Sequence, residues 1–204
     1  MRHSLFAFMA CIAGLAGCET AWHRAGPVPV SVARGKDIYQ ENCSGCHAIR
    51  ATGDSFRAVP ALAGQRFEYL RRQIDRFASD ERHSAAMRWA FNRVSMSTPQ
   101  AAIDVATYLS QLPEQKFAEG DPLHQTEGKT GFVAHCAACH GMDARGNVDG
   151  TTPSLRAQHD SYLVNRLRQF ASTSMTVGDH NLDERAIIAI SAYLSSMQGV
   201  DATE

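Results

Sequence analysis

The sequence predicts an all-α protein made of two tandem domains, each formed by a few short helices. Apolar residues recur at intervals of three and four, as in amphipathic helices, and no stretch alternates as a strand would. Many residues of the first half also recur 93 positions later, which indicates an internal duplication. The matching pairs are Gly35 and Gly128, Pro60 and Pro153, Leu62 and Leu155, Gln65 and Gln158, Tyr69 and Tyr162, and Phe77 and Phe170.

The first half, residues 31–112, is expected to form three main helices. The first covers about 32–42. The second covers 67–77, where apolar residues at i, i+4 and i+7 make one face. The third begins at Thr98 and Pro99, because a capping residue followed by proline in the first turn is a helix start, and it runs to the end of this half.

The second half, residues 123–204, repeats this plan. A helix over 128–135 is the counterpart of the first helix. A helix with the same apolar spacing covers 163–170, and a last helix covers 183–197. The segment 113–122 is bounded by prolines and contains glycine and several charges. We therefore expect it to be the linker between the two domains.

The N-terminal segment 1–17 combines a basic start with an apolar run over 5–16. That run is shorter than the about 20 residues that a membrane-spanning helix needs, and it fits a secretory signal. Its end, Leu-Ala-Gly before Cys18, resembles a bacterial lipoprotein box in which the thiol of Cys18 carries lipid. An ordinary signal cut nearby and an uncleaved anchor are the alternatives. The polar, proline-containing residues 18–30 are interpreted as a tether.

Each half contains the pattern Cys-x-x-Cys-His. The residues are Cys43, Cys46 and His47 in the first half and Cys136, Cys139 and His140 in the second. Two thiols at this spacing add across the two vinyl groups of a haem, and the adjacent imidazole binds its iron from one face. We therefore predict two covalently attached haem c groups, which would also give two small domains an apolar surface to pack against.

The remaining cysteines agree with an exported protein. The two motifs use four of the six cysteines, Cys18 is the lipidation candidate, and Cys11 lies in the segment to be removed. No disulfide is therefore expected. Attachment of c-type haem takes place on the outer side of the bacterial cytoplasmic membrane, which predicts a periplasmic protein held at a membrane through Cys18.

The sixth iron ligand decides the chemistry, because a methionine closes the site for electron transfer whereas an open position permits reactions with small molecules. In the second half Met175 is the only methionine in the loop before the last helix. In the first half Met87 and Met96 compete. Met175 lies seven residues before Leu182 and Met87 lies seven before Val94, so the spacing favours Met87. Met96, beside a helix cap, is interpreted as a core residue.

Other side chains near these loops have simpler interpretations. His83, His159 and His180 stand alone in polar loops, so they are expected to be solvated although each could reach an iron. Trp89 and Phe91 flank Met87 and are expected to line the haem crevice, with an exposed docking role for one of them as the alternative.

These motifs resemble the dihaem cytochrome c4 family, whose members consist of two class I cytochrome c domains. The resemblance is carried by both Cys-x-x-Cys-His motifs, by Pro-Ala-Leu-Ala-Gly-Gln over 60–65 with Tyr69-Leu70, and by a weaker copy over 153–162. It covers nearly all of residues 31–198. The family implies an all-α fold of two such domains, each with a few short helices around one haem.

The resemblance also implies roles for individual residues. It assigns Met87 and Met175 as sixth ligands, and it assigns Pro60 and Pro153 as residues whose carbonyl oxygens accept a hydrogen bond from the motif histidine of the same half. The sequence departs from the family pattern in the lipoprotein box, in an alanine before the second glutamine, and in the short loop around Met175.

The charges divide unevenly between the halves. Residues 31–112 carry 11 Lys and Arg against 8 Asp and Glu, whereas residues 113–204 carry 7 against 12. Such a dipole can orient the protein toward different partners, although both surfaces can equally be ordinary solvated ones. No basic run is interleaved with aromatic residues, so nucleic-acid binding is not expected.

These expectations combine into a functional prediction. We predict a periplasmic one-electron carrier between a quinol-oxidising complex or dehydrogenase and a terminal oxidase or reductase. No catalytic acid, base or substrate pocket is evident, so an enzyme in its own right is not predicted. The alternatives are the cytochrome subunit of a larger dehydrogenase complex, and a haem enzyme or sensor with one open iron site.

Overall fold

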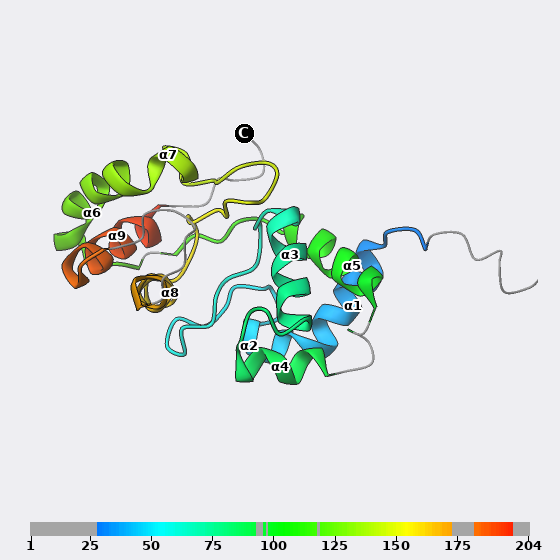
Figure 1. Ribbon diagram of the computed structural model, residues 1–204. Coiled ribbons are helices and arrows are strands. Elements are labelled where there is room, and N and C mark those ends of the chain that lie inside the picture. The colour runs from blue at the N-terminus through cyan, green and yellow to red at the C-terminus, as the bar shows by residue number, and fades with distance from the viewer. Residues whose placement is uncertain (1–27, 93–95, 97, 118, 173–181, 198–204) are drawn as a thin grey trace, which may run out of the picture.

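The computed structural model describes residues 28–92, 96, 98–117, 119–172 and 182–197 (Figure 1). Within these ranges the chain is helical, and its β-type pairing is limited there to one isolated antiparallel bridge between Asp54 and Val59. The helices are α1 (Val32–Asn42), α2 (Ser44–His47), α3 (Phe67–Ala78), α4 (Ala85–Phe91), α5 (Pro99–Ser110), α6 (Pro122–His135), α7 (Ala137–His140), α8 (Asp160–Ser172) and α9 (Glu184–Ser196). The signal 1–17, Cys18, Met175 and His180 lie outside the described residues.

The first half packs α1 and α3 against α5, with α4 beside α3 (Figure 1). Tyr39 of α1 and Tyr108 of α5 form the centre of its core, with ring centroids 5.6 Å apart. Leu70 of α3 joins them from the apolar face that the sequence predicted. Because the apolar faces of three helices meet here, each helix is stabilised mainly by this packing.

The second half repeats the arrangement, with α6 and α8 packed against α9. Phe132 of α6 and Tyr193 of α9 have ring centroids 5.7 Å apart, as the two tyrosines have in the first half. Ile190 and Leu194 complete the core around them. The predicted all-α fold with a duplicated core is therefore confirmed in the described part of the chain.

A glycine in each half allows the first and last helices to cross closely. A Cβ atom at Gly35 would lie 2.0 Å from the carbonyl oxygen of Asp104, and one at Gly128 would lie 1.9 Å from that of Ala189. Any other residue at these positions would clash with backbone. The duplicated glycines are therefore explained by the crossing of α1 with α5 and of α6 with α9.

Most helix starts follow the local signals of the sequence. The Thr98 hydroxyl accepts from the backbone N–H of Ala101 at 3.2 Å, and the Asp183 carboxylate accepts from that of Ala186 at 2.8 Å. Two features differ from the expectation. Helix α6 begins at Pro122, earlier than the predicted residue 128, and the short helix α4 was not predicted.

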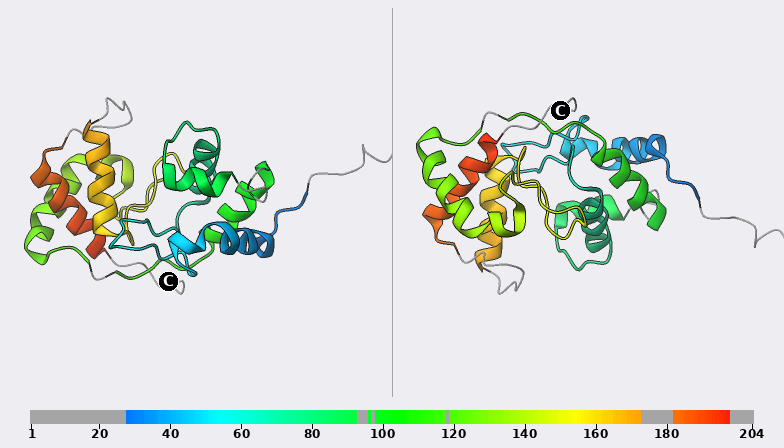
Figure 2. Two further views of the ribbon diagram at one scale, coloured as in Figure 1. Left: turned by 90° about the horizontal axis from the view of Figure 1, so that it is seen from below. Right: turned by 90° about the horizontal axis from the view of Figure 1, so that it is seen from above.

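Two long loops, 48–66 and 141–159, lie between the two groups of helices in all three ribbon views (Figures 1 and 2). Hydrogen bonds join the halves here: Arg66 Nε donates to Arg145 O at 3.0 Å between the two loops, and Ser161 Oγ at the start of α8 donates to Ser55 O at 2.6 Å. These polar contacts pack the two domains directly against each other through the loops that follow the Cys-x-x-Cys-His motifs.

His159 lies in this interface, so the expectation that it is solvated is wrong. Only 4% of the residue is exposed. Its Nδ1 lies 2.9 Å from Glu119 Oε1 of the interdomain segment, and its Nε2 lies 2.7 Å from the carbonyl oxygen of Thr52 in the first half. The sequence did not predict the burial of His159, because both of its partners are more than 35 residues away in the chain.

None of the described helices is both long and apolar enough to cross a bilayer.

Asp104 joins the start of α1 to α5. It is fully buried, forms an ion pair with Arg34 and accepts a hydrogen bond from the backbone N–H of Ser31 at 2.9 Å. The Gln100 amide donates to it as well, at 2.9 Å. Burial by itself would raise the pKa of Asp104, but its three donors together hold that pKa below its usual range.

We expect Asp104→Asn to lower the free energy of unfolding by about 2 kcal/mol at neutral pH, because hydrogen bonds to a charged group are lost. A depressed pKa stabilises the fold above the ordinary carboxyl value of about 3.9, and this contribution disappears as the pH falls through the folded-state pKa. The difference between wild type and Asp104→Asn in chemical denaturation should therefore narrow in acid.

Asp75→Asn is the matched control, because Asp75 pairs with Arg71 on the exposed face of α3 at 2.7 Å. An exposed i, i+4 pair contributes about 0.3–0.5 kcal/mol. Equal effects of the two substitutions would contradict the role assigned to Asp104.

Candidate functional site

The two Cys-x-x-Cys-His motifs adopt the same backbone conformation at the end of the first helix of each half. The N–H of Cys43 ends α1 by donating to Tyr39 O at 2.8 Å, and the N–H of Cys136 ends α6 by donating to Phe132 O at 2.8 Å. The next four residues form the one-turn helices α2 and α7. The turn places both thiols and the histidine of each motif in one local unit.

The thiols are free and differ in exposure. Cys46 and Cys139 are exposed, Cys43 is half-buried and Cys136 is buried, and no disulfide joins them. Burial, with a smaller effect of the neighbouring thiol, raises the pKa of Cys43 to about 12 and that of Cys136 to about 11. Two cysteines that are not joined in a disulfide are what covalent attachment of a haem requires, so the pairs fit this role.

Both motif histidines are buried and held by a proline carbonyl. His47 is 5% exposed with Nδ1 at 3.0 Å from Pro60 O, and His140 is 9% exposed with Nδ1 at 3.1 Å from Pro153 O. Because a carbonyl only accepts, each Nδ1 must carry the proton, which makes Nε2 the ring nitrogen that can bind a metal. Burial lowers the pKa of His47, which keeps the ring neutral as a ligand.

The loops from histidine to proline are built alike. The N–H of Gly53 donates to His47 O at 2.9 Å, and the N–H of Gly146 donates to His140 O at 2.8 Å. These bonds close each loop so that the proline returns to the imidazole thirteen residues later. The donor set in each half, two thiols and one neutral imidazole, fits a covalently bound haem with a histidine ligand.

The methionines of the first half lie in different surroundings. Met96 is 6% exposed and belongs to the core cluster with Tyr39 and Tyr108. Met87 is half-buried in α4, where its N–H donates to Ser84 Oγ at 3.3 Å. Met175 lies outside the described residues, so the second methionine remains a sequence-based prediction.

The two aromatic residues of α4 lie in different surroundings. Phe91 packs on the core and its ring lies 6.0 Å from that of Phe77, as expected for a residue facing the interior. Trp89 is 62% exposed, which is compatible with the alternative of an exposed docking role for one of these two residues. His83 is exposed beside Asp80, at 3.0 Å, which agrees with its interpretation as a solvated residue.

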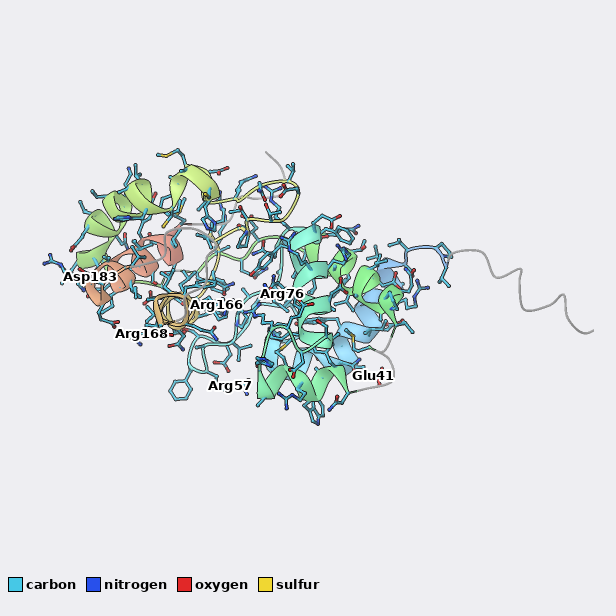
Figure 3. The ribbon with its side chains drawn as sticks, viewed as in Figure 1. Glu41, Arg57, Arg76, Arg166, Arg168 and Asp183 are labelled. Carbon is cyan, nitrogen blue, oxygen red and sulfur yellow. The ribbon has the colours of Figure 1, made fainter. Side chains whose placement is uncertain are left out.

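A basic and aromatic cluster between the halves was not predicted. Arg82 donates to the hydroxyl of Tyr162 at 3.3 Å, and its guanidinium lies 4.5 Å from the centre of the Phe77 ring. Burial lowers the pKa of Arg166, whose guanidinium lies 4.3 Å from the Phe170 ring. Figure 3 shows Arg166 of α8 facing Arg76 of α3 across this boundary. This cluster depends on contacts between the halves, which sequence spacing does not reveal.

An all-α fold of two tandem units, each with paired thiols beside a buried imidazole, defines a protein that carries two covalently bound haem c groups. The chain belongs to the cytochrome c family. The model of that family, described as cytochrome c, matches residues 32–113 and 125–179.

Related proteins support the same class. Cytochrome c-552 of Acidithiobacillus ferridurans is 26% identical over 208 residues, which cover 95% of this chain and 86% of that protein. The cbb3-type cytochrome c oxidase subunit FixP of Bradyrhizobium diazoefficiens is 25% identical over 183 residues, which cover 82% of this chain. The match spans 61% of that subunit.

The fold is also that of a solved dihaem protein. Reduced recombinant cytochrome c4 from Pseudomonas stutzeri superimposes with a TM-score of 0.73 at 21% identity, covering 83% of this chain and all of that one. This likeness confirms the predicted pair of class I cytochrome c domains.

We expect replacement of both Cys43 and Cys46 by alanine to leave a protein with one covalent haem, because the second motif is built independently. Replacement of both Cys136 and Cys139 should do the same, whereas Cys11→Ala should leave two. Mass spectrometry of the denatured protein measures the number of haems attached. Two haems on either double variant would contradict the assigned attachment sites.

Proposed function

We propose that this chain is a periplasmic one-electron carrier that passes electrons from a quinol-oxidising complex or dehydrogenase to a terminal oxidase or reductase. The observation that carries the proposal is the pair of buried imidazoles whose Nδ1 atoms are held by Pro60 and Pro153. This arrangement would hold the iron ligand of each half in a fixed orientation, which suits electron transfer. We propose electron transfer, and not catalysis, as the activity.

When bound, a haem supplies an iron that takes up and releases a single electron. His47 and His140 would hold the two irons through Nε2, while the proline carbonyls fix the orientation of the rings. Met87 and Met175 would supply thioether sulfurs as the second protein ligands of the two irons, which would raise the reduction potential and exclude other ligands. Two protein ligands for each iron would suit a carrier, since the set of ligands need not change between oxidation states.

The proposed partners rest on the relatives. One of them is a subunit of a cbb3-type cytochrome c oxidase, which supports an oxidase as the electron acceptor. The charge difference between the halves supports separate docking sites for donor and acceptor, because opposite potentials steer different partners.

We expect the ferric protein to show two low-spin haems in its optical and magnetic spectra, because both irons would have six ligands. Met87→Ala should convert one haem to high spin, while Met96→Ala should leave both low-spin. A high-spin haem in the wild type would favour an enzyme or sensor with an open site. An unchanged spectrum for Met87→Ala together with a changed one for Met96→Ala would reverse the assignment.

A second candidate is a cytochrome subunit of a larger complex. It is favoured by the FixP relative, which is itself an oxidase subunit. In this case the chain would exchange electrons inside a permanent assembly, without diffusing between partners.

How the protein is attached to the membrane distinguishes the carrier function from the subunit function. We propose that lipidated Cys18 anchors the protein, and we expect Cys18→Ser to move it from the membrane fraction to the soluble periplasmic fraction. Immunoblotting of the fractions, with Cys11→Ser as the control, measures this change. Retention of Cys18→Ser in membranes, with another protein at constant stoichiometry, would support the subunit function.

A further inference from the structure

Two glutamines at equivalent positions each reach into the other domain. The Gln158 side chain exchanges two hydrogen bonds with the backbone of Ala61: Ala61 N–H donates to Oε1 at 2.9 Å, and Nε2 donates to Ala61 O at 3.0 Å. The Gln65 side chain does the same with Ser154, at 3.0 Å for the N–H and 2.8 Å for the carbonyl. We call these four bonds the crossed glutamine contacts.

Each contact is formed at the residue that follows the histidine-binding proline. The carbonyl of Pro60 and the N–H of Ala61 belong to one peptide group, as do the carbonyl of Pro153 and the N–H of Ser154. One side of each peptide group therefore accepts from a haem-motif histidine of its own domain. The other side donates to a glutamine of the opposite domain.

Hydrogen bonds on the two sides of a peptide group strengthen each other, because a donating N–H increases the negative charge on the carbonyl oxygen. A Gln158 oxygen that accepts from Ala61 N–H thus makes Pro60 O a better acceptor for His47 Nδ1–H. The imidazole then donates more electron density through Nε2, which favours the ferric state.

Burial makes this effect stronger at one site than at the other. Gln158 is 7% exposed and Ala61 is 6% exposed, so water does not compete for their bonds. Ser154 is buried as well, but Gln65 is only half-buried. In a low-dielectric surrounding a hydrogen bond polarises its neighbours more, so the Gln158 contact should have the larger influence.

From these contacts we propose that Gln158 is a positioning residue for the haem of the first domain and Gln65 for the haem of the second. Each domain thereby sets part of the reduction potential of the other. The proposal rests on the proposed roles of His47 and His140 as iron ligands. It adds a coupling between the domains, in which each domain affects the reduction potential of the other haem through the histidine ligand of that haem.

The test uses the full-length protein with both haems. Gln158→Met keeps the length of the side chain but removes its hydrogen bonds. We expect it to shift the reduction equilibrium of the first-domain haem toward the ferrous state by about threefold, which is roughly 30 mV for a one-electron couple. Gln65→Met should shift the second-domain haem in the same direction by a smaller factor.

NMR-monitored redox titration gives the two potentials separately, since haem methyl signals can be assigned to a domain by their contacts. A second readout is the Nδ1–H resonance of His47 in the ferrous protein, which should move upfield in Gln158→Met because its hydrogen bond weakens. Ser161→Ala is the control. It removes the interdomain bond to Ser55 without touching either proline peptide group, and it should move neither potential.

Three results would overturn the proposal. The first is that Gln158→Met keeps the low-spin spectra of the wild type and changes neither the potential nor the Nδ1–H resonance. This result would leave the electron-carrier function intact. The second is a shift in the haem of the glutamine's own domain. The third is an equal shift in Ser161→Ala, which would mean that any loosening of the interface has the same effect. Failure of the carrier function itself would be visible in the wild-type spectra.

Discussion

The hydrogen bond from a buried histidine to a proline carbonyl organises the haem-binding loop of each half. It occurs twice, at 3.0 Å for His47 and at 3.1 Å for His140. It fixes the tautomer of the ring, and it determines the course of the loop that returns to the ring after the motif. The helices of each half supply a stable base for this loop, because loop residues such as Ala51 and Ala144 belong to the core that the apolar faces of the helices form.

The same loops also join the domains, so metal ligation and domain packing share one set of residues. Gln158, next to His159 in sequence, binds the peptide group that follows Pro60. His159 itself links the interdomain segment to the first half through Glu119 and Thr52. Because these side chains are buried and their polar atoms are paired, removing one partner while the other stays buried would leave an unsatisfied polar group, which costs free energy. The loops that follow the two motifs are therefore packed together in one interface.

Most helices and the local motifs could be predicted from the sequence, because their signals act over a few residues. Helix α1 has the expected bounds, and the caps at Thr98 and Asp183 lie where residue type indicated. Helix α4 was missed because seven residues are too few for a clear apolar period. The burial of His159 was also missed, since the surroundings of a single side chain depend on segments far away in the chain.

The sequence by itself determined the duplicated all-α plan, the two Cys-x-x-Cys-His motifs and the pairing of equivalent positions 93 residues apart, because these are properties of spacing and residue type. Only the tertiary structure decided that the equivalent glutamines bind across the domains and not within them. The physical reason is that a glutamine amide can pair with any peptide group of suitable orientation. Which peptide group lies within reach is set by how the two cores pack together.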